Sequence, residues 1–283
     1  MESSESKLIM ITGCNKGVGF GILENLAINR SGYKFLMAVR SLKRGEEAVQ
    51  ELKSLVHNIE ERVTLRELDI ANSASIDSFV QWIKEKGIKV DCLVNNAGIA
   101  IKTNKLNHHI TKETFQTNFY GTVELTEKML PLLPEHAKII NITTDTASFG
   151  TLKDPNFHSK LDKQGLTREE LFQVAKEFED LASKEPEKQN HPFPTEAYPV
   201  YNFSKLLVSV YTRLLASNPE MQKRGIQVYS CSPGWVKTDI GGPTAEFTIQ
   251  EGSQCPCNII NMPYEFKPDL QGKFFCNSEV TPL

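Results

Sequence analysis

The fold is decided by the stretch KLIMITGCNKGVGFGILENLAIN, residues 7–29. Its first six residues are mainly apolar and predict a buried strand, and the residues from Lys16 onward predict a helix. Between them, Gly13, Gly17 and Gly19 follow the pattern T-G-x-x-x-G-x-G. Such a turn lets the backbone approach a pyrophosphate, which the unpaired N–H groups at a helix N-terminus can bind. We therefore predict a phosphate-binding turn at the junction of this strand and this helix.

The rest of the chain repeats the alternation of strand and helix. Further strands are predicted at 33–39, 62–68, 90–95, 137–143 and 226–232, with a weaker one at 272–276, and helices at 44–56, 73–86, 110–130 and 199–216. Strands that alternate with helices favour a parallel sheet, and near-continuously apolar strands are typical of a sheet covered on both faces. No linker or repeat interrupts the pattern. We predict one α/β domain over residues 1–283, a doubly wound parallel sheet with helices on both faces.

One connection is too long for this alternation. More than fifty residues separate the strand at 137–143 from the helix at 199–216. Within them, residues 167–184 carry apolar side chains at helical spacing, and Thr167 with Glu170 forms a capping box. The sequence therefore predicts a helical insertion at about 150–198.

Composition excludes several classes of protein. With 40% apolar residues, 24% charged residues and a net charge of −3, the chain lacks the basic excess of a nucleic-acid-binding protein. No apolar run is long enough to span a bilayer, and MESSESK at the start lacks the features of a secretory signal. The six cysteines and six histidines show no metal-ligand spacing. We predict a cytoplasmic protein with reduced thiols, no metal, and no nucleic-acid or membrane partner.

Two cations near the glycine turn bear on the choice of dinucleotide. The second strand ends in LMAVRS, which places Arg40 where an NAD site usually has an acidic residue for the ribose 2′-OH. Lys16 lies inside the glycine turn. Two cations suit a 2′-phosphate, so NADPH is predicted over NADH. The alternative is that both are ordinary solvated charges.

Tyr201 and Lys205 lie one helical turn apart, so their side chains share a face of the predicted helix. A free tyrosine titrates near pH 10, and a cation within about 4–6 Å lowers that pKa. Tyr201 is the only tyrosine with a lysine four residues on. The pair is predicted to be a proton donor and its activator, although on its own such spacing is as typical of a surface pair.

Five motifs occur in a specific order: NNAG at 95–98, TNFYGT at 117–122, IINITT at 139–144, YNFSK at 201–205 and SPGWVKTDIGGP at 232–243. This set resembles the short-chain dehydrogenase/reductase superfamily over roughly residues 7–250. GCNKGVGF, FQTNFYGT and PGWVKTDIGGP, together with the long insertion, resemble its carbonyl reductase group. The resemblance implies a Rossmann-type fold and a monomer, because in that group the insertion covers the face that builds tetramers in other members.

The resemblance also implies roles for four catalytic residues. Tyr201 would be the general acid that protonates the carbonyl oxygen, and Lys205 would lower the tyrosine pKa and bind the nicotinamide ribose. Thr144 stands where the family usually has the serine that orients the carbonyl. Asn118 would hold a water that links Lys205 to solvent.

The cofactor would lie along the ends of several strands. Besides Tyr201 and Lys205, the expected contacts are Gly13, Asn15, Lys16, Gly17, Val18, Gly19, Arg40, Asp69, Ile70, Asn95, Ala97, Gly98, Pro233, Gly234, Val236 and Thr238. Of these, Asn95, Ala97 and Gly98 are expected beside the adenosine ribose and Asp69 at the adenine. An apolar substrate wall is expected from Ile99, Phe149, Tyr198, Trp235 and Ile240, each of which could equally be a core residue.

The function that these features favour is NADPH-dependent reduction of carbonyl compounds to alcohols, with Tyr201 as general acid. The substrates would be small molecules: ketones, aldehydes and, as a further class, quinones. One alternative is a reductase or dehydrogenase dedicated to a single pterin, steroid or terpenoid ketone. A second is a non-catalytic NADP-binding sensor, which would tolerate the loss of Tyr201.

Overall fold

The structure is a computed structural model that describes residues 6–103, 105–184 and 198–283. Its strands are β1 (Lys7–Thr12), β2 (Tyr33–Val39), β3 (Val63–Glu67), β4 (Cys92–Asn95), β5 (Lys138–Ile142), β6 (Gln227–Ser232), β7 (Phe274–Cys276) and β8 (Glu279–Thr281). They form one sheet in the order β3-β2-β1-β4-β5-β6-β7-β8, parallel except for the antiparallel pairing of β8 with β7. The predicted fold class is confirmed. The strand order reverses between β1 and β4, where such sheets open a crevice at the carboxyl ends of their strands.

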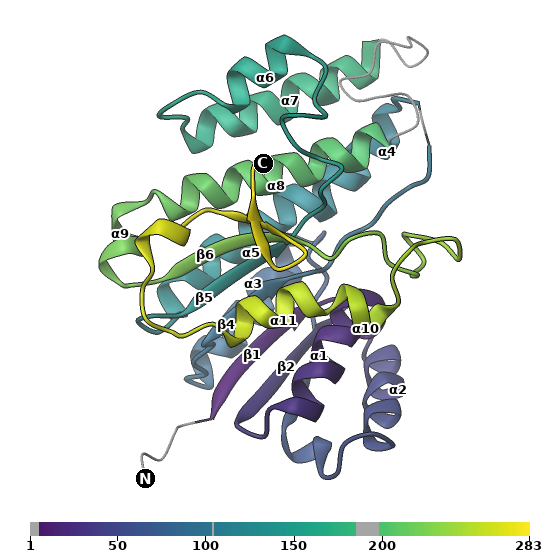
Figure 1. Ribbon diagram of the computed structural model, residues 1–283, viewed down its shortest axis with the longest axis vertical. Coiled ribbons are helices and arrows are strands. Elements are labelled where there is room, and N and C mark those ends of the chain that lie inside the picture. Colours follow the sequence, from purple (N-terminus) through teal and green to yellow (C-terminus); the bar gives the residue numbers. More distant parts are fainter. Residues whose placement is uncertain (1–5, 104, 185–197) are drawn as a thin grey trace.

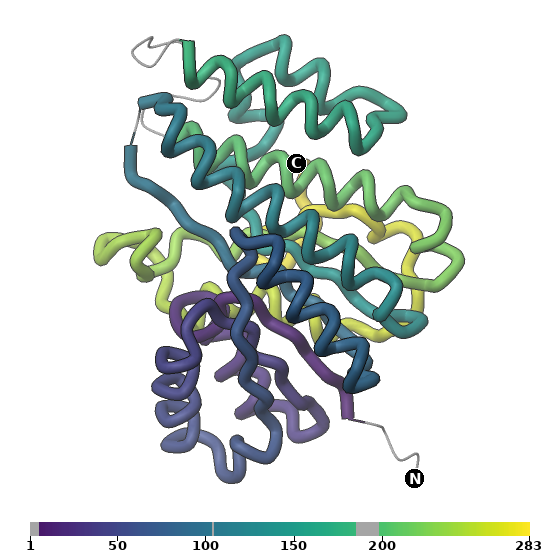
Figure 2. Tube along the Cα trace, turned by 180° about the vertical axis from the view of Figure 1, so that it is seen from behind, coloured from purple at the N-terminus to yellow at the C-terminus, as the bar shows by residue number. Residues whose placement is uncertain are grey.

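Helices cover both faces of this sheet (Figure 1). They are α1 (Gly17–Asn29), α2 (Leu42–Lys53), α3 (Ser73–Glu85), α4 (His108–Phe115), α5 (Thr122–Met129), α6 (Pro155–Leu161), α7 (Arg168–Lys184), α8 (Pro199–Ala216), α9 (Pro219–Lys223), α10 (Ile249–Gly252) and α11 (Gln254–Asn261). Successive side chains of β1 point to opposite faces, so Ile9 and Met10 belong to different cores. Met10 packs on the α3, α5 and α8 side, which Figure 2 shows from behind, and Ile9 packs on the α1 and α11 side.

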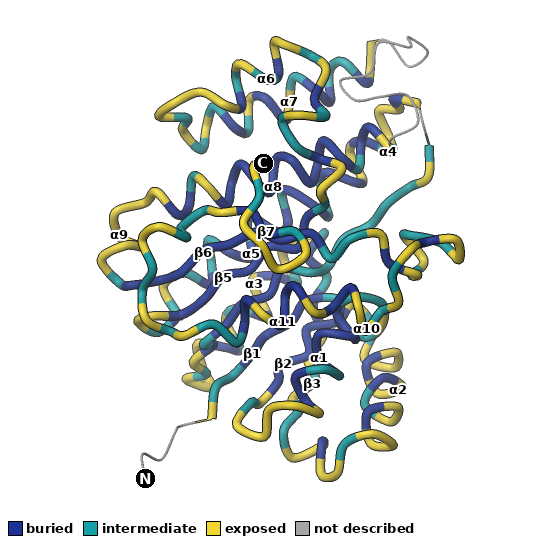
Figure 3. The backbone as a smooth tube through the Cα atoms, viewed as in Figure 1, coloured by how far each residue is buried: buried dark blue, intermediate teal, exposed yellow. Residues whose placement is uncertain are grey.

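The sheet is the most deeply buried part of the molecule (Figure 3). Every residue of β5 and β6 is buried, whereas the outward faces of the helices are exposed. This burial suits the mainly apolar strands β1, β2 and β4, whereas β5 and β6 also bury polar side chains such as Lys138 and Gln227.

The helix predicted at 110–130 is present, with a π-helical turn in its middle. The structure divides it into α4, a π-helical turn at Gln116–Gly121, and α5. Gly121 lies against the carbonyl oxygen of Ile70 so closely that a Cβ atom there would overlap with it. The wider π-turn brings the backbone to this contact, and such turns occur frequently at functional sites.

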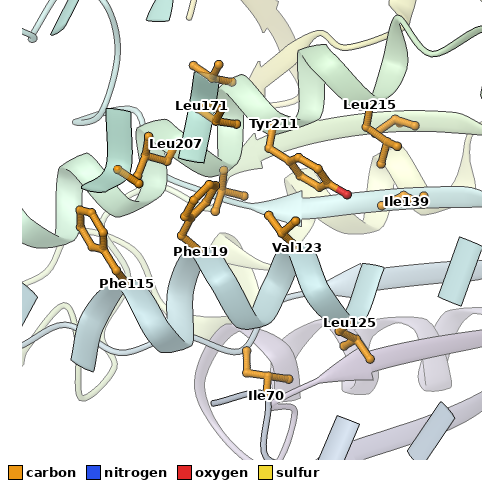
Figure 4. Packing of buried hydrophobic residues seen from close by; sticks show 14 of the residues in the cluster. Ile70, Phe115, Phe119, Val123, Leu125, Ile139, Leu171, Leu207, Tyr211 and Leu215 are labelled. Carbon is orange, nitrogen blue, oxygen red and sulfur yellow. The ribbon is translucent and has the colours of Figure 1, made fainter. Parts of the chain in front are cut away.

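The predicted insertion contains α6 and α7; its residues 185–197 lie outside the described part of the chain. The predicted capping box is confirmed, because the Glu170 N–H donates to the Thr167 hydroxyl (3.2 Å) and the Thr167 N–H donates to the Glu170 carboxylate (3.0 Å). α7 packs through Phe178, whose ring centroid lies 4.1 Å from that of Phe203 on α8 and 5.4 Å from that of Phe115 on α4. Figure 4 shows Phe115 and neighbouring side chains pointing toward α8.

The C-terminal strands differ from the expectation. The predicted strand at 272–276 is the three-residue β7, and a further strand, β8, follows it after a two-residue turn. Asn277 (φ 50°) and Ser278 (φ 66°) both adopt left-handed conformations in that turn. Two positive φ angles are what a tight hairpin turn of this type requires, but Asn-Ser is a weaker signal for it than Asn-Gly.

Candidate functional site

A cavity of about 1140 Å³ opens at the carboxyl ends of the central strands. Most of the predicted site residues line it, although they come from segments far apart in the sequence. They are Gly13, Asn15, Lys16, Gly17, Val18, Arg40, Asp69, Ile70, Ala97, Gly98, Ile99, Thr144, Tyr198, Tyr201, Lys205, Pro233, Gly234, Trp235, Val236, Thr238 and Ile240. Four predicted residues, Gly19, Asn95, Asn118 and Phe149, do not line it.

The glycine turn enters the cavity with a backbone that favours glycine. Gly13 and Gly17 have φ angles of 65° and 59°, in the left-handed region. Gly19 does not line the cavity. It is needed for packing, because a side chain there would overlap with Asn96. The Asn96 side-chain amide in turn donates to the Thr12 carbonyl (2.8 Å). Gly19 therefore lets the 95–98 turn pack onto the glycine turn.

The side chain of Asn95 does not face the cavity in which the cofactor contacts are predicted. It is buried, and its amide nitrogen donates to the Thr126 hydroxyl and to the Asn141 side-chain oxygen, both at 2.8 Å. Its side chain thus points into the sheet–helix interior, while Asn96 lines the cavity. The two-residue alternation of a strand would have separated these neighbours from the sequence alone.

The basic end of the cavity lies after β2. Arg40 is exposed there, and Arg44, which was not among the predicted residues, lies on the first turn of α2 and also lines the cavity. Lys16 forms an ion pair with Asp239 across the mouth, and this contact holds the pKa of the Asp239 carboxyl below its usual range. At this end of the cavity, Arg40 and Arg44 form no ion pair with any described carboxylate.

Tyr201 and Lys205 lie on the cavity side of α8. The Lys205 ammonium donates to the Ile142 carbonyl (2.8 Å) and lies 5.9 Å from the centroid of the Tyr201 ring. Burial lowers the pKa of Lys205 to about 8. Burial, and secondly the Asp145 carboxylate, raise the pKa of Tyr201 to about 12. The pKa of Tyr201 is thus raised and not lowered, because burial and the Asp145 carboxylate both disfavour the phenolate.

Asn118, on the π-turn, braces the chain beside this pair. Its side-chain oxygen accepts from the Ile99 N–H (2.8 Å), and its nitrogen donates to the Ile99 carbonyl (2.9 Å) and to the Ser204 hydroxyl (3.0 Å). A Cβ at Gly98 would lie 3.2 Å from both the Asn118 oxygen and the Lys205 nitrogen. The side chain of Asn118 therefore fixes the 98–99 backbone against Lys205.

Thr144 lies at the end of β5, at the start of a chain of hydroxyl groups. The Thr146 hydroxyl donates to the Asn202 side-chain oxygen (3.0 Å) and lies 2.9 Å from the Thr144 hydroxyl. Because the Thr146 proton is engaged with Asn202, the Thr144 hydroxyl is the donor to Thr146. Thr146 and Asn202 both line the cavity, and the expected set of residues contained neither.

The mouth of the cavity carries exposed apolar side chains. Trp235 is 53% exposed, Tyr198 40% and Ile240 37%, and the indole N–H of Trp235 donates to the Gly241 carbonyl (2.9 Å).

Phe149 is a correction, because it lines a separate cavity of about 990 Å³ between the α6–α7 connection and α8. Its ring centroid lies 5.1 Å from that of His158. The turn at 148–151, closed by the Ser148 N–H on the Thr151 hydroxyl, carries it away from the mouth.

The described part of the chain contains neither a metal-ligand cluster nor a helix that could span a membrane. No group of three or more His, Cys, Asp and Glu side chains there could hold a metal ion. Within the same part of the chain, no helix is both long enough and apolar enough to cross a bilayer.

Known proteins are similar to this chain in sequence and in fold. The model of the short chain dehydrogenase family matches residues 7–176. Carbonyl reductase (NADPH) 1 of Mus musculus is 34% identical over 289 residues, which cover 99% of each chain.

Solved structures of plant reductases have the same fold. Salutaridine reductase from Papaver somniferum superposes with a TM-score of 0.81 at 26% identity, covering 95% of this chain and 99% of that one. Menthone neomenthol reductase from Mentha piperita gives 0.78 at 25% identity, covering 98% and 100%. With the strand order, the glycine turn and the Tyr201–Lys205 pair in one cavity, these matches show that the chain belongs to the short-chain dehydrogenase family.

Proposed function

We propose that this chain reduces ketones and aldehydes to alcohols with NADPH, and that Tyr201 supplies the proton. One observation carries the proposal: a half-buried tyrosine and a buried lysine share the cavity that the glycine turn opens. The name of the mouse relative, an NADPH carbonyl reductase, supports both the reaction and the cofactor.

The residues of the cavity fit the dinucleotide. Gly13 and Gly17 give the turn the left-handed backbone that brings it close to a ligand, and the N-terminus of α1 offers N–H groups and a positive dipole end to a pyrophosphate. Arg40 and Arg44 suit a 2′-phosphate at the end of β2. When bound, the nicotinamide supplies the hydride.

The chain's own residues hold the proton and transfer it to the substrate oxygen. With a pKa of about 12, Tyr201 holds its proton at neutral pH and releases it only to an oxygen that gains negative charge. The Lys205 ammonium, on the same helix face, stabilises the phenolate that forms. The Thr144 hydroxyl can turn from Thr146 to donate to the same carbonyl oxygen.

The test follows NADPH oxidation by absorbance against a panel of ketones, aldehydes and quinones, with NADH in parallel. We expect NADPH-specific turnover that falls by a factor of about 10³ or more in Tyr201→Phe, which keeps the ring but has no proton to give. Tight NADPH binding with no turnover that depends on Tyr201 would instead identify a binding protein on a reductase scaffold.

We further infer that the protein is a cytoplasmic monomer with a single domain. α7 packs against α4 and α8, where it covers an aromatic face that includes Phe115 and Phe203, and this supports the monomer. The six cysteines are all free thiols, which is typical of a reducing compartment. One sheet contains all eight strands of the described chain, and this supports a single domain.

A further inference from the structure

Asp145 is a cavity residue that the proton chemistry does not use. It follows Thr144 directly, and its exposed side chain lines the cavity. One carboxylate oxygen, Oδ1, accepts from the Ser232 hydroxyl (2.9 Å) and lies 3.4 Å from the Thr144 hydroxyl, whose proton is directed at Thr146. Within the described ranges, no cationic side chain forms an ion pair with it. Asp239, which also lines the cavity, is by contrast neutralised by Lys16.

The uncompensated charge lies at the substrate end of the cavity. It is close enough to Tyr201 to add to the effect of burial in raising the pKa of that hydroxyl. The hydrogen bond from Thr146 to Asn202 (3.0 Å) also ties the 144–146 turn to α8, one residue past Tyr201. β5 lies three strands away from β2 in the sheet, or about 14 Å at the usual strand spacing. Arg40 and Arg44 therefore belong to the other end.

Aromatic faces accompany the carboxylate. Trp235 and Tyr198 line the same cavity and are about half exposed, so each ring can meet a ligand. The bond from the Trp235 indole to the Gly241 carbonyl holds that ring in place. Aromatic faces attract cations, and attract quaternary ammonium groups in particular.

We propose that this cavity selects carbonyl compounds that carry a positively charged nitrogen, and that Asp145 is the residue that recognises the charge. The proposal rests on the proposed reductase function and narrows its substrate class. The reaction itself is unchanged: hydride goes to the carbonyl carbon and the Tyr201 proton to its oxygen. An unpaired carboxylate beside that oxygen favours a cation over a neutral molecule of the same shape.

A purely structural role for Asp145 must be separated from this one. The Ser232 hydroxyl that donates to Asp145 also accepts from the Gly234 N–H (3.1 Å), so Asp145 anchors the 232–234 loop. Asp145→Asn keeps a side-chain oxygen for Ser232 and removes only the charge. Asp239→Asn is the matched control, because it removes a mouth carboxylate that Lys16 already neutralises.

The experiment compares two ketones of nearly equal shape, 4-(trimethylammoniomethyl)acetophenone and 4-neopentylacetophenone. The measured quantity is the ratio of their kcat/KM values within one enzyme, so any general loss of catalysis in a variant cancels. We expect the wild type to prefer the cationic ketone by about tenfold or more, Asp145→Asn to lose most of that preference, and Asp239→Asn to keep it.

Each outcome decides the question. Equal ratios in the wild type and Asp145→Asn, with the neutral ketone turned over, would overturn the charge-recognition proposal and leave the reductase function standing. If neither ketone reacts, the reductase proposal fails for these substrates, and thermal shifts of the NADPH complex with each ketone decide the inference. A larger shift with the cation that Asp145→Asn abolishes supports it; equal shifts overturn it.

Discussion

At Thr144, one methyl group distinguishes the side chain from the serine that the family usually carries. Threonine is stiff about χ1, and here its hydroxyl is held by Thr146, which Asn202 holds in turn. To assist a carbonyl, the hydroxyl must leave that partner and adopt a rotamer that its methyl group permits.

Thr144→Ser is therefore expected to preserve kcat or to raise it by up to about tenfold, because serine turns more freely. Thr144→Val, which keeps the shape and removes the donor, should lower kcat by a factor of about 10²–10³. Steady-state kinetics on one ketone measure both variants. Complete inactivation by the serine would show that Thr144 is not the residue that assists the carbonyl.

At the same scale, the sequence predicted which segments meet at the cavity better than which side chains face it. Motif order placed the glycine turn, the 95–98 turn and α8 together, because carboxyl ends of parallel strands share one edge. The side chains of Asn95 and Phe149 do not face the cavity, since a strand's alternation and a local turn decide where each side chain points. Asp145 and Thr146 were missed because only their contacts distinguish them from other polar loop residues.

Among the elements, α7 has the clearest consequence. Its Phe178 stacks on Phe203 and Phe115, and Leu171, Val174 and Ala175 of the same helix are buried. The capping box made its start predictable. The π-turn between α4 and α5 was not predictable, because it depends on Gly121 meeting Ile70, a contact between segments distant in the sequence.

Because α7 occupies the outer face of α4 and α8, we expect a monomer in solution. Light scattering coupled to size exclusion should give a mass near 31.8 kDa at every concentration tested. A stable dimer of the wild type would contradict the assignment of α7 as a cover.

Phe178→Ala should cost about 3–5 kcal/mol of stability by opening a cavity under this helix.

For the whole molecule, buried thiols lower stability in alkali. Burial raises the pKa values of Cys14, Cys92 and Cys257 from 9.0 to about 12. The unfolded chain loses these protons above pH 9 while the folded chain keeps them, so each thiol destabilises the fold as pH rises from 9 to 12. Lys138 and Lys205 act oppositely: burial lowers their pKa values to about 8, so they add stability between pH 8 and 10.5.

Above pH 10.5 the lysine effect is complete, and the thiols act together with tyrosines such as Tyr201 and Tyr229, whose pKa values burial raises to about 12. We therefore expect the free energy of unfolding, measured with urea, to fall steeply between pH 10.5 and 12. Cys257→Ala should reduce that slope by about 1.4 kcal/mol per pH unit, the value for one proton. An unchanged slope in this variant would mean that the Cys257 thiol titrates normally in the folded protein.

The strand order has a consequence for how the chain is made. From β1 the sheet extends through β2 and β3 on one side, and through β4 to β8 on the other, in the order of synthesis. Each strand that leaves the ribosome thus finds its neighbour already present. Two strands pair late: β4 returns to β1 only after β2, β3 and α3 have emerged, and β6 joins β5 only after α6 to α9 have emerged. During these intervals β1 and then β5 present an open edge, so they are when a nascent chain most needs protection from aggregation.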